Sequence, residues 1–179
     1  MRVIAGKARS LQLKTPKGLN TRPTLDRIKE TLFNILQNDI PGCVFVDLFA
    51  GSGAIGIEAL SRGAIKAYFI DNNKEAIGCI NDNLLFTHLN EDAVVLSGDF
   101  LSSLHMINEN HIDIIFADPP YEALYEDKIL DILYNLKGVD ENTIIIIEAK
   151  IDNKINNNNY EIIKEKIYKT NKHIFLRRK

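Results

Sequence analysis

The sequence is poor in the residues and segments that mark secreted, metal-binding or membrane proteins. Its two cysteines, Cys43 and Cys79, stand apart from each other, and its four histidines are scattered without the spacing of metal ligands. We therefore expect buried thiols in a reducing compartment and no metal site. No uncharged apolar run reaches the roughly 18 residues that a transmembrane helix needs, and the basic first residues lack the apolar core of a signal peptide. These absences favour a cytoplasmic protein that makes no membrane contact.

What the chain does contain is an ordinary share of apolar residues and an uneven distribution of charge. With 179 residues, 45% of them hydrophobic and 26% charged, it fits one domain with a sizeable core and a small appendage. The net charge is −2, but residues 1–30 carry eight Lys and Arg against two acids, and residues 160–179 carry seven against two. Basic ends around an acidic middle favour an anionic partner, and charge that only solubilises flexible ends is the alternative.

From residue 43 onward, strand-like and helix-like apolar patterns alternate along the chain. The patterns predict strands at 43–49, 67–71, 93–99, 112–118 and 143–150, and helices at 54–61, 73–88, 101–108 and 124–136. Repeated β-α units with strongly apolar strands favour an α/β fold with a doubly wound, mostly parallel sheet that is covered by helices on both faces.

The two ends of the chain depart from this alternation. Residues 1–20 contain two short strand-like pieces around a polar turn, which predicts a basic N-terminal β-hairpin extension ahead of a main domain at 21–179. Helical periodicity begins at Leu25, with Thr24 as its candidate N-cap, and ends before Pro41. After an asparagine-rich tract, the pattern at 160–179 predicts a final antiparallel hairpin.

A glycine-rich loop follows the first predicted strand of the main domain. Gly51, Gly53 and Gly56 have GxGxxG spacing between a strand and a helix, and Asp71 lies twenty residues after Gly51, at the end of the next strand. This pattern is typical of dinucleotide-binding sites, in which the glycines admit a close ligand and the acid binds ribose hydroxyls. It also suits S-adenosylmethionine, and glycines that only form a tight turn are the alternative.

Four acids lie at or near the ends of four successive predicted strands, namely Asp47, Asp71, Asp99 and Asp118. The carboxyl ends of parallel strands meet at one edge of a sheet, where ligands of such folds bind. A pyrophosphate would be repelled by these acids, whereas the sulfonium and ammonium groups of S-adenosylmethionine would be attracted. The acids therefore favour the cationic cofactor, with four separate helix caps as the alternative.

The stretch "DPPY" places an acid, two prolines and an aromatic ring at the end of the fourth strand. An exocyclic amine of a nucleobase is a poor nucleophile, and acceptors aimed at its N–H groups stabilise the charge that develops during attack. Asp118 and a backbone carbonyl beside Pro119 supply such acceptors, and the prolines hold them rigidly. Tyr121 offers a ring on which an extruded base can stack. Transfer of a methyl group by direct displacement then needs positioning rather than a metal or a covalent intermediate.

Three stretches together resemble the RsmD family of bacterial 16S ribosomal RNA guanine-N2 methyltransferases: "TRPTLDRIKETLFNIL", "DLFAGSGAIGIEAL" and "DPPY". The basic start of the chain and the terminal strand pair are similar as well, so the resemblance covers nearly the whole chain. It implies a seven-stranded, Rossmann-like methyltransferase sheet with an N-terminal β-hairpin extension. The tail departs from the family pattern because it lacks the glycine of the last turn, which leaves the geometry of that hairpin open.

The resemblance also implies roles for individual residues. It assigns S-adenosylmethionine, which leaves as S-adenosylhomocysteine, to a site at Asp47, Gly51 and Gly53, with the ribose at Asp71 and the adenine near Asp99. It assigns the target amine to Asp118, Pro119 and Tyr121, and it requires no metal. The stretch from Arg22 to Thr24 matches an upstream motif near the methionine end of the cofactor or the RNA.

The expected partner is 16S ribosomal RNA in the assembled or assembling small subunit, and nothing in the sequence demands more than a monomer. Basic residues of the first segment would then bind phosphate groups; they are Arg2, Lys7, Arg9, Lys14, Lys17 and Arg22. Four alternatives remain open: a DNA adenine methyltransferase, a glutamine-directed protein methyltransferase, a nicotinamide-dependent oxidoreductase and a non-catalytic RNA-binding module. The first usually needs an additional recognition domain, and the motif of the second usually begins with asparagine rather than aspartate. The oxidoreductase leaves Asp47 and the "DPPY" stretch unexplained, and the RNA-binding module leaves the four acids without a role.

Overall fold

A computed structural model describes residues 1–16, 23–120, 125–156 and 158–179, and it describes side chains of the first helix from residue 26 onward. The strands form a seven-stranded sheet in the order β3-β2-β1-β4-β5-β7-β6. Strands β1 to β5 are parallel, whereas β7 is antiparallel to β5, and β6 to β7. The strands are β1 (Val44–Leu48), β2 (Lys66–Asp71), β3 (Ala93–Ser97), β4 (Ile114–Ala117), β5 (Ile144–Lys150), β6 (Tyr160–Ile167) and β7 (Asn171–Arg178).

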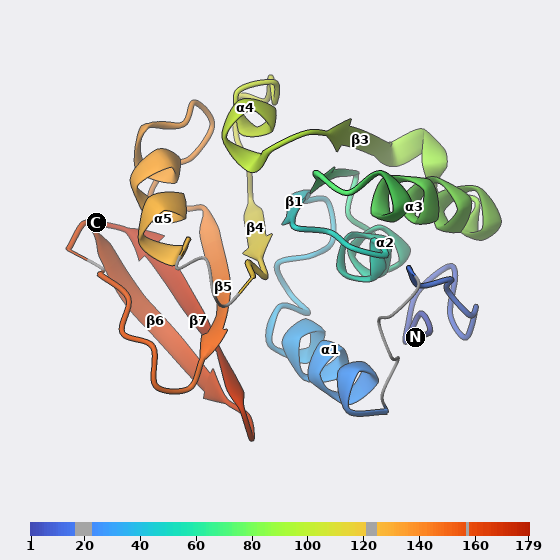
Figure 1. Cartoon of the computed structure of the whole chain (residues 1–179), viewed down its shortest axis with the longest axis horizontal. Coiled ribbons are helices and arrows are strands. Elements are labelled where there is room, and N and C mark those ends of the chain that lie inside the picture. The colour runs from blue at the N-terminus through green and yellow to red at the C-terminus, as the bar shows by residue number, and fades with distance from the viewer. Residues whose placement is uncertain (17–22, 121–124, 157) are drawn as a thin grey trace.

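Helices cover both faces of this sheet (Figure 1). One apolar cluster contains Phe33, Ile57 and Ile80 from the first three helices, and a second contains Leu104 and Leu133 from the last two. The predicted doubly wound α/β sheet is therefore confirmed. Among the described residues, no helix is both long and apolar enough to cross a membrane. The helices are α1 (Pro23–Ile35), α2 (Ala54–Ser61), α3 (Lys74–Thr87), α4 (Phe100–Leu104) and α5 (Glu126–Asn135), with a 3-10 turn η1 (Asn90–Asp92).

The central strands are buried along their whole length, which explains their continuous apolar sequence. Every residue of β1 and β4 is buried, as expected for strands that helices cover on both faces. Leu48, at the end of β1, pairs with Ile70 in β2 and with Ala117 in β4. The segments that follow these three strands therefore emerge at the same edge of the sheet.

The N-terminal segment is held by a single antiparallel bridge rather than by a ladder of two strands. Arg2 is bridged to Gln12, and the flanking backbone bonds join Val3 N to Leu11 O at 3.0 Å and Leu13 N to Met1 O at 2.9 Å. Buried side chains of this segment lie in the same apolar cluster as α1 to α3. The segment thus packs onto the main sheet's helices, and the predicted boundary at residue 20 falls outside the described residues.

The C-terminal hairpin forms as predicted, and its turn needs no glycine. Strands β6 and β7 pair in antiparallel register with one irregularity between Ile162 and Lys164. At the turn, Tyr168 N–H donates to the carbonyl of Asn171 at 2.8 Å, and no residue from 168 to 171 has a positive φ. Because every residue of the turn adopts an ordinary conformation, the missing family glycine is not required.

Two predicted helix ends are wrong. Helix α1 begins at Pro23, so Thr24 lies in its first turn and is not the N-cap; proline suits a first helical position because its missing N–H would have no partner there. Helix α4 runs from Phe100 to Leu104 instead of 101–108. Its end is closed by i to i+3 bonds from Met106 N to Ser103 O and from Ile107 N to Leu104 O, which stop the helix in a tight turn.

Candidate active site

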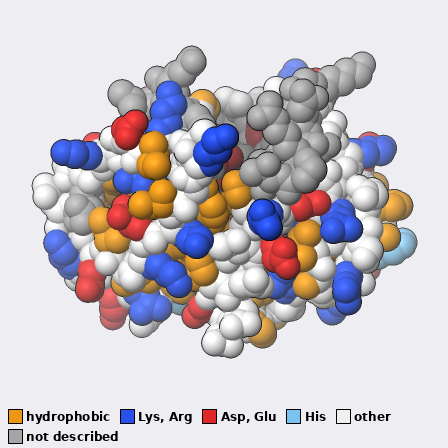
Figure 2. Space-filling model, turned by 90° about the horizontal axis from the view of Figure 1, so that it is seen from below, with side chains coloured by type: hydrophobic (Ala, Val, Ile, Leu, Met, Phe, Trp, Pro, Cys, Tyr) orange, Lys and Arg blue, Asp and Glu red, His pale blue; other side chains and the backbone are white. Residues whose placement is uncertain are grey.

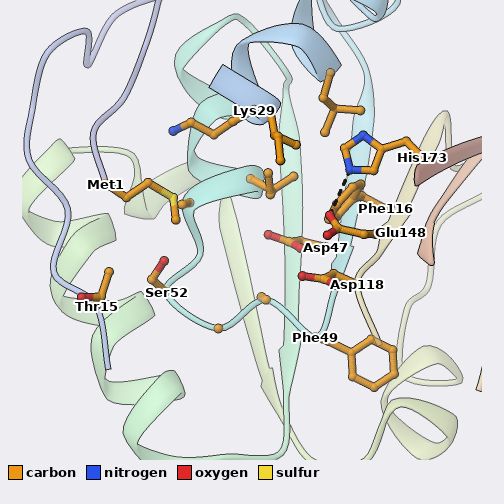
Figure 3. Close-up of a pocket in the computed structure, with 16 residues that line it drawn as sticks. Met1, Thr15, Lys29, Asp47, Phe49, Ser52, Phe116, Asp118, Glu148 and His173 are labelled. Atoms are coloured by element: carbon orange, nitrogen blue, oxygen red, sulfur yellow. Dashed lines mark hydrogen bonds and ion pairs between the residues drawn. The ribbon is translucent and has the colours of Figure 1, made fainter. Parts of the chain in front are cut away.

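Two adjoining cavities lie at the edge of the sheet where β1, β2 and β4 end. Phe49 lines both of them. The larger has a volume of about 350 Å³, and its polar lining includes Lys29, Asp47, Ser52, Asp118, Glu148 and His173 (Figure 3). The smaller has a volume of about 240 Å³ and is lined mainly by Asp71, Asn72, Asp99, Phe100, Pro120, Tyr125 and Lys128. The structure thus brings the four predicted acids to one edge of the sheet, two in each cavity.

The glycine loop connects β1 to α2 through residues with left-handed backbone geometry. Gly53 has φ 75° and is the N-cap of α2, a conformation in which a side chain would be strained. Glycine is required at position 56 for a different reason, because a Cβ atom there would lie 2.4 Å from the ring of Phe69. Phe49 has φ 64° without being glycine, and such strain is often stored beside functional sites. The loop therefore combines a turn with close packing of α2 on the sheet.

Asp47 is buried beneath this loop and faces the larger cavity. Its Oδ2 atom accepts a hydrogen bond from Gly56 N–H at 2.9 Å, and only 2% of the residue is exposed. Burial raises the pKa of Asp47 to about 7; the Gly56 N–H opposes this shift and the charge of Asp71 adds to it. A cation bound in the cavity would favour the ionised form of this carboxylate.

Asp71 ties the glycine loop to the start of α3. Its Oδ2 accepts from Gly51 N–H at 2.8 Å, and its Oδ1 accepts from Asn73 N–H at 2.8 Å. Asn73 in turn caps α3 through the N–H groups of Glu75 and Ala76. Each carboxylate oxygen has capacity for a further donor, so Asp71 can bind hydroxyl groups in the smaller cavity while it holds the loop.

Asp99 is the N-cap of α4, which agrees with the alternative that the strand-end acids are helix caps. Its side chain accepts from the N–H groups of Leu101 and Ser102 at 3.1 Å each and from the Ser102 hydroxyl. These Ser102 hydrogen bonds lower the pKa of Asp99. Asp99 also lines the smaller cavity. Its place directly before α4 is explained by capping alone, so this place is not in itself evidence of ligand binding. Of the four acids, the other three are not the N-cap of a described helix.

Asp118 follows β4 and points into the larger cavity beside Asp47 and Glu148 (Figure 3). Its side chain is open to the cavity, but protein surrounds its other sides. This burial, together with the charges of Glu148 and Asp47, raises the pKa of Asp118 to about 8. Pro119 is buried, and Tyr121 lies outside the described residues.

Sequence reasoning missed two further groups of site residues. Glu148 of β5 and His173 of β7 line the larger cavity, and the only signal for them is that Glu148 interrupts an apolar strand. The other group is aromatic: Phe49, Phe100 and Tyr125 surround the smaller cavity, with ring centroids 5.2 to 6.2 Å apart. Such rings provide flat apolar surfaces for a heterocycle.

A buried charged cluster attaches the N-terminal segment to the site. Glu58 of α2 is fully buried and accepts from Ile4 N–H at 2.8 Å, from Ala5 N–H at 3.0 Å and from Arg62 Nε at 2.7 Å. Lys29 Nζ of α1 lies 3.1 Å from Glu58 Oε2. Through these contacts the segment is fixed so that side chains of Met1 and Thr15 form part of the larger cavity wall.

The predicted RNA-binding residues of this segment differ in their surroundings. Lys7 and Arg9 are exposed. Arg2 lies 3.6 Å from Asp26, and Lys14 forms an ion pair with Asp82 at 2.8 Å; both pairs are solvent-exposed and therefore weak. Figure 2 shows Lys and Arg side chains spread over this side of the molecule rather than gathered in one patch. Lys17 and Arg22 lie outside the described residues, as does the side chain of Thr24.

The strand order, the glycine turn after β1 and the acids at the strand ends define a Rossmann-like methyltransferase fold, and solved structures agree. The Escherichia coli protein yhhF, described as a candidate methyltransferase, has a TM-score of 0.85 and 29% identity, covering 100% of this chain and 98% of that one. A candidate methylase from Haemophilus influenzae has a TM-score of 0.83 and 30% identity, covering 99% and 98% of the two chains.

The family follows from the sequence comparisons. The family model described as Conserved hypothetical protein 95 matches residues 1–177. The Haemophilus influenzae protein named Ribosomal RNA small subunit methyltransferase D is 35% identical over 169 residues, which cover 93% of this chain and 88% of that protein. The Escherichia coli protein of the same name is 33% identical over 153 residues, covering 86% and 76%. The chain belongs to this family, the RsmD family that its motifs resemble.

Proposed function

We propose that the protein transfers a methyl group from S-adenosylmethionine to the N2 amine of a guanine in 16S ribosomal RNA of the small subunit. The observation that carries this proposal is the pair of adjoining cavities at the carboxyl edge of the sheet, one acidic and one aromatic. Relatives over most of the chain are named ribosomal RNA small subunit methyltransferases, which supports ribosomal RNA as the substrate class. The guanine N2 target rests on the resemblance of the motifs.

The residues present fit S-adenosylmethionine. In the smaller cavity, Asp71 would bind the ribose hydroxyls, and the rings of Phe100 and Tyr125 would hold the adenine beside Asp99. In the larger cavity, the buried carboxylate of Asp47 would bind the ammonium group of the methionine part. When bound, the cofactor supplies a methyl group on a positively charged sulfur. A nicotinamide dinucleotide fits this lining poorly, because its pyrophosphate would meet the same acids.

Asp118 would act on the target amine. Its carboxylate accepts a hydrogen bond from N2, which raises electron density on that nitrogen as it attacks the methyl carbon. Bound S-adenosylmethionine would supply this methyl group to N2, and its sulfur would keep the electrons of the broken bond. The surplus proton on N2 then passes to Asp118, whose pKa of about 8 suits a base that works near neutral pH. Stacking of the base on Tyr121 stays a prediction.

A methyl-transfer assay tests the proposal directly. Purified protein is incubated with tritium-labelled S-adenosylmethionine and with small subunits that lack the modification, free 16S RNA, or duplex DNA. We expect label in the RNA, recovered as N2-methylguanosine after digestion and mass analysis. Label in DNA as N6-methyladenine would favour the alternative amino-directed methyltransferase. Calorimetric binding of NADH without binding of S-adenosylmethionine would contradict the proposal altogether.

A further inference from the structure

The strand register brings Glu148 next to Asp118, on the same face of the sheet. Ala117 of β4 pairs with Ile147 of β5, so the residues that follow each of them, Asp118 and Glu148, lie on neighbouring strands at the same level. Glu148 pairs in turn with His173 of β7. Figure 3 shows the carboxyl groups of Asp118 and Glu148 in the larger cavity, with His173 behind Glu148.

Hydrogen bonds from residues of β7 and the preceding turn hold the Glu148 carboxylate in place. His173 Nε2 lies 3.0 Å from Glu148 Oε2, and Asn171 Nδ2 donates to Glu148 Oε1. The Tyr168 hydroxyl lies 3.2 Å from His173 Nδ1. Burial and the charge of Glu148 raise the pKa of Tyr168 to about 12, so its hydroxyl is available as a donor. In the tautomer with a proton on Nε2, His173 donates to Glu148 and accepts from Tyr168 at Nδ1.

A purely structural role does not account for this arrangement. The Glu148 side chain is 14% exposed and His173 only 1%, so the acid reaches the cavity while its partner is sealed inside. Glu148 has the donors of a structural ion pair in His173 and Asn171, but it also lies beside a second acid, Asp118, whose ionisation it opposes. Two adjacent carboxylates suit a ligand that presents two adjacent N–H donors. In the described part of the chain, no group of three or more acid, histidine or cysteine side chains is arranged to hold a metal ion.

We propose that Glu148 determines the base specificity of the site by accepting a hydrogen bond from N1–H of guanine, while Asp118 accepts from the N2 amine. This inference rests on the proposed function and assigns the second acceptor. In guanine the N1–H and the N2 amine stand on neighbouring atoms and point the same way, as the two acids require. Adenine carries a lone pair at N1, which a carboxylate repels. His173 and Asn171 are positioning residues that hold Glu148 at the level of Asp118.

The base analogue 2-aminopurine separates the two acceptors, because it keeps the N2 amine but has a lone pair at N1. Small subunits are reconstituted with 16S RNA that carries, at the mapped target, either guanine or 2-aminopurine introduced by ligation. We expect the wild-type protein to prefer guanine by about 100-fold or more in single-turnover rate, since sites that bind a substrate N–H reject analogues lacking it. If the wild-type protein transferred no methyl group to subunits with guanine at the target, the proposed function itself would be contradicted. This result is obtained before 2-aminopurine is used, so it is distinguished from a failure of the inference about Glu148.

Glu148→Gln is the decisive variant, because its amide has the same shape and can donate to N1 of 2-aminopurine. We expect the preference for guanine to fall below about 10-fold, through a slower rate on guanine and an equal or faster rate on 2-aminopurine. Glu161→Gln, an exposed change on β6, is the matched control and should keep the full preference. Calorimetry with S-adenosylmethionine verifies that each variant is folded. An unchanged preference in Glu148→Gln, or an equal loss of rate on both bases, would overturn the inference.

The positioning role of His173 is tested with the same ratio of rates. His173→Leu removes the donor to Glu148 and should lower the preference for guanine, whereas His173→Gln keeps an N–H donor and should restore most of it. A merely structural role would change the stability of both variants without changing the ratio. If a folded His173→Leu protein kept the wild-type preference for guanine, His173 would have no role in positioning Glu148.

Discussion

Two clusters of charged side chains lie close together in this molecule, and they differ in how their acids are paired with cations. At the N-terminal segment, Glu58 is surrounded by donors, including Lys29 and Arg62. In the larger cavity, Asp47 and Asp118 form no ion pair among the described residues, and burial with the charges of Glu148 and Asp47 raises the pKa of Asp118. Lys29 lines the same cavity, but its ammonium group is bonded to Glu58 and to the carbonyl of Arg2. The compensated cluster stabilises the attachment of the N-terminal segment, and the uncompensated cluster of Asp47 and Asp118 is suited to a ligand that brings cations and N–H donors.

The largest effect is expected from breaking the compensated cluster. Glu58→Ala leaves Lys29 buried without its acid, and removing one partner of a buried pair costs about 3–5 kcal/mol of unfolding free energy. Urea denaturation followed by circular dichroism measures this change. Glu30→Ala, an exposed change on the same helix as Lys29, is the control and should cost less than about 0.5 kcal/mol. A loss below about 1 kcal/mol for Glu58→Ala would contradict the structural role of the cluster.

The next effect concerns the chemistry of the uncompensated cluster. Asp118→Ala should lower the methyl-transfer rate by about 100- to 1,000-fold, the usual cost of removing one group that stabilises developing charge. The affinity for S-adenosylmethionine should stay within a few-fold, as calorimetry would measure. Asp152→Ala, an exposed acid outside the cavities, serves as the control. Undiminished turnover of Asp118→Ala would refute its assignment to the target amine.

The same residue gives the reaction a pH dependence. Because the ionised carboxylate is the acceptor and its pKa is raised to about 8 before the cationic cofactor binds, the single-turnover rate of the wild-type protein should rise with pH and level off at or below pH 8. Asp118→Asn keeps an uncharged oxygen acceptor, so it should be slower and lose this rise. A wild-type rate that falls across the same range would show that the protonated form of the acid is the active one.

A smaller effect on stability distinguishes Asp47 from an acid that supports the fold. Its folded-state pKa of about 7 lies above the ordinary pKa of 3.8 for aspartate, so the folded protein holds a proton that the unfolded chain releases. Stability is therefore lost as pH rises from about 4 to 7. Asp47→Asn should remove this loss and raise the melting temperature by a few degrees at pH 8, with little change at pH 4. A lower melting temperature at pH 8 would indicate a stabilising carboxylate instead.

The smallest effect is expected at the exposed basic residues. Reversing the charge of both Lys7 and Arg9 should weaken association with the small subunit and reduce the salt slope by about one unit per lost phosphate contact. The same change at Lys137 and Lys154, which are exposed elsewhere, is the matched control. Binding titrations at several salt concentrations measure both. Equal slopes for the two double variants would remove the N-terminal segment from the RNA interface.

Local patterns in the sequence predicted the sheet and the acids at or near the ends of its strands. The continuous apolar runs placed β1 and β4, and Asp47 and Asp118 followed from the rule that ligands bind at the carboxyl edge of a parallel sheet. The resemblance to a known family then implied the number of strands and the roles of these residues, whereas the order of the strands comes from the structure. Each of these patterns lies within a short stretch of neighbouring residues, so it can be recognised in one sequence.

The rest of the site depends on contacts between distant segments. His173 and Glu148 meet only because β7 pairs with β5 in one register, and no local pattern specifies that register. The clamp on the N-terminal segment joins Glu58 to Ile4 across 54 positions. Asp99 shows that an acid at a strand end is ambiguous, since it caps α4 and also lines the smaller cavity, and its contact with the cofactor stays a prediction.

The central claim is that the uncompensated acids form a receptor for a cationic cofactor, and proton release on binding tests it most directly. Calorimetry of S-adenosylmethionine binding at pH 7, in two buffers of different ionisation enthalpy, counts the protons released. We expect proton release, because a bound cation lowers the pKa of Asp47 from about 7 and that of Asp118 from about 8, and we expect a smaller release in Asp47→Asn. Binding without proton release in the wild-type protein would contradict the account.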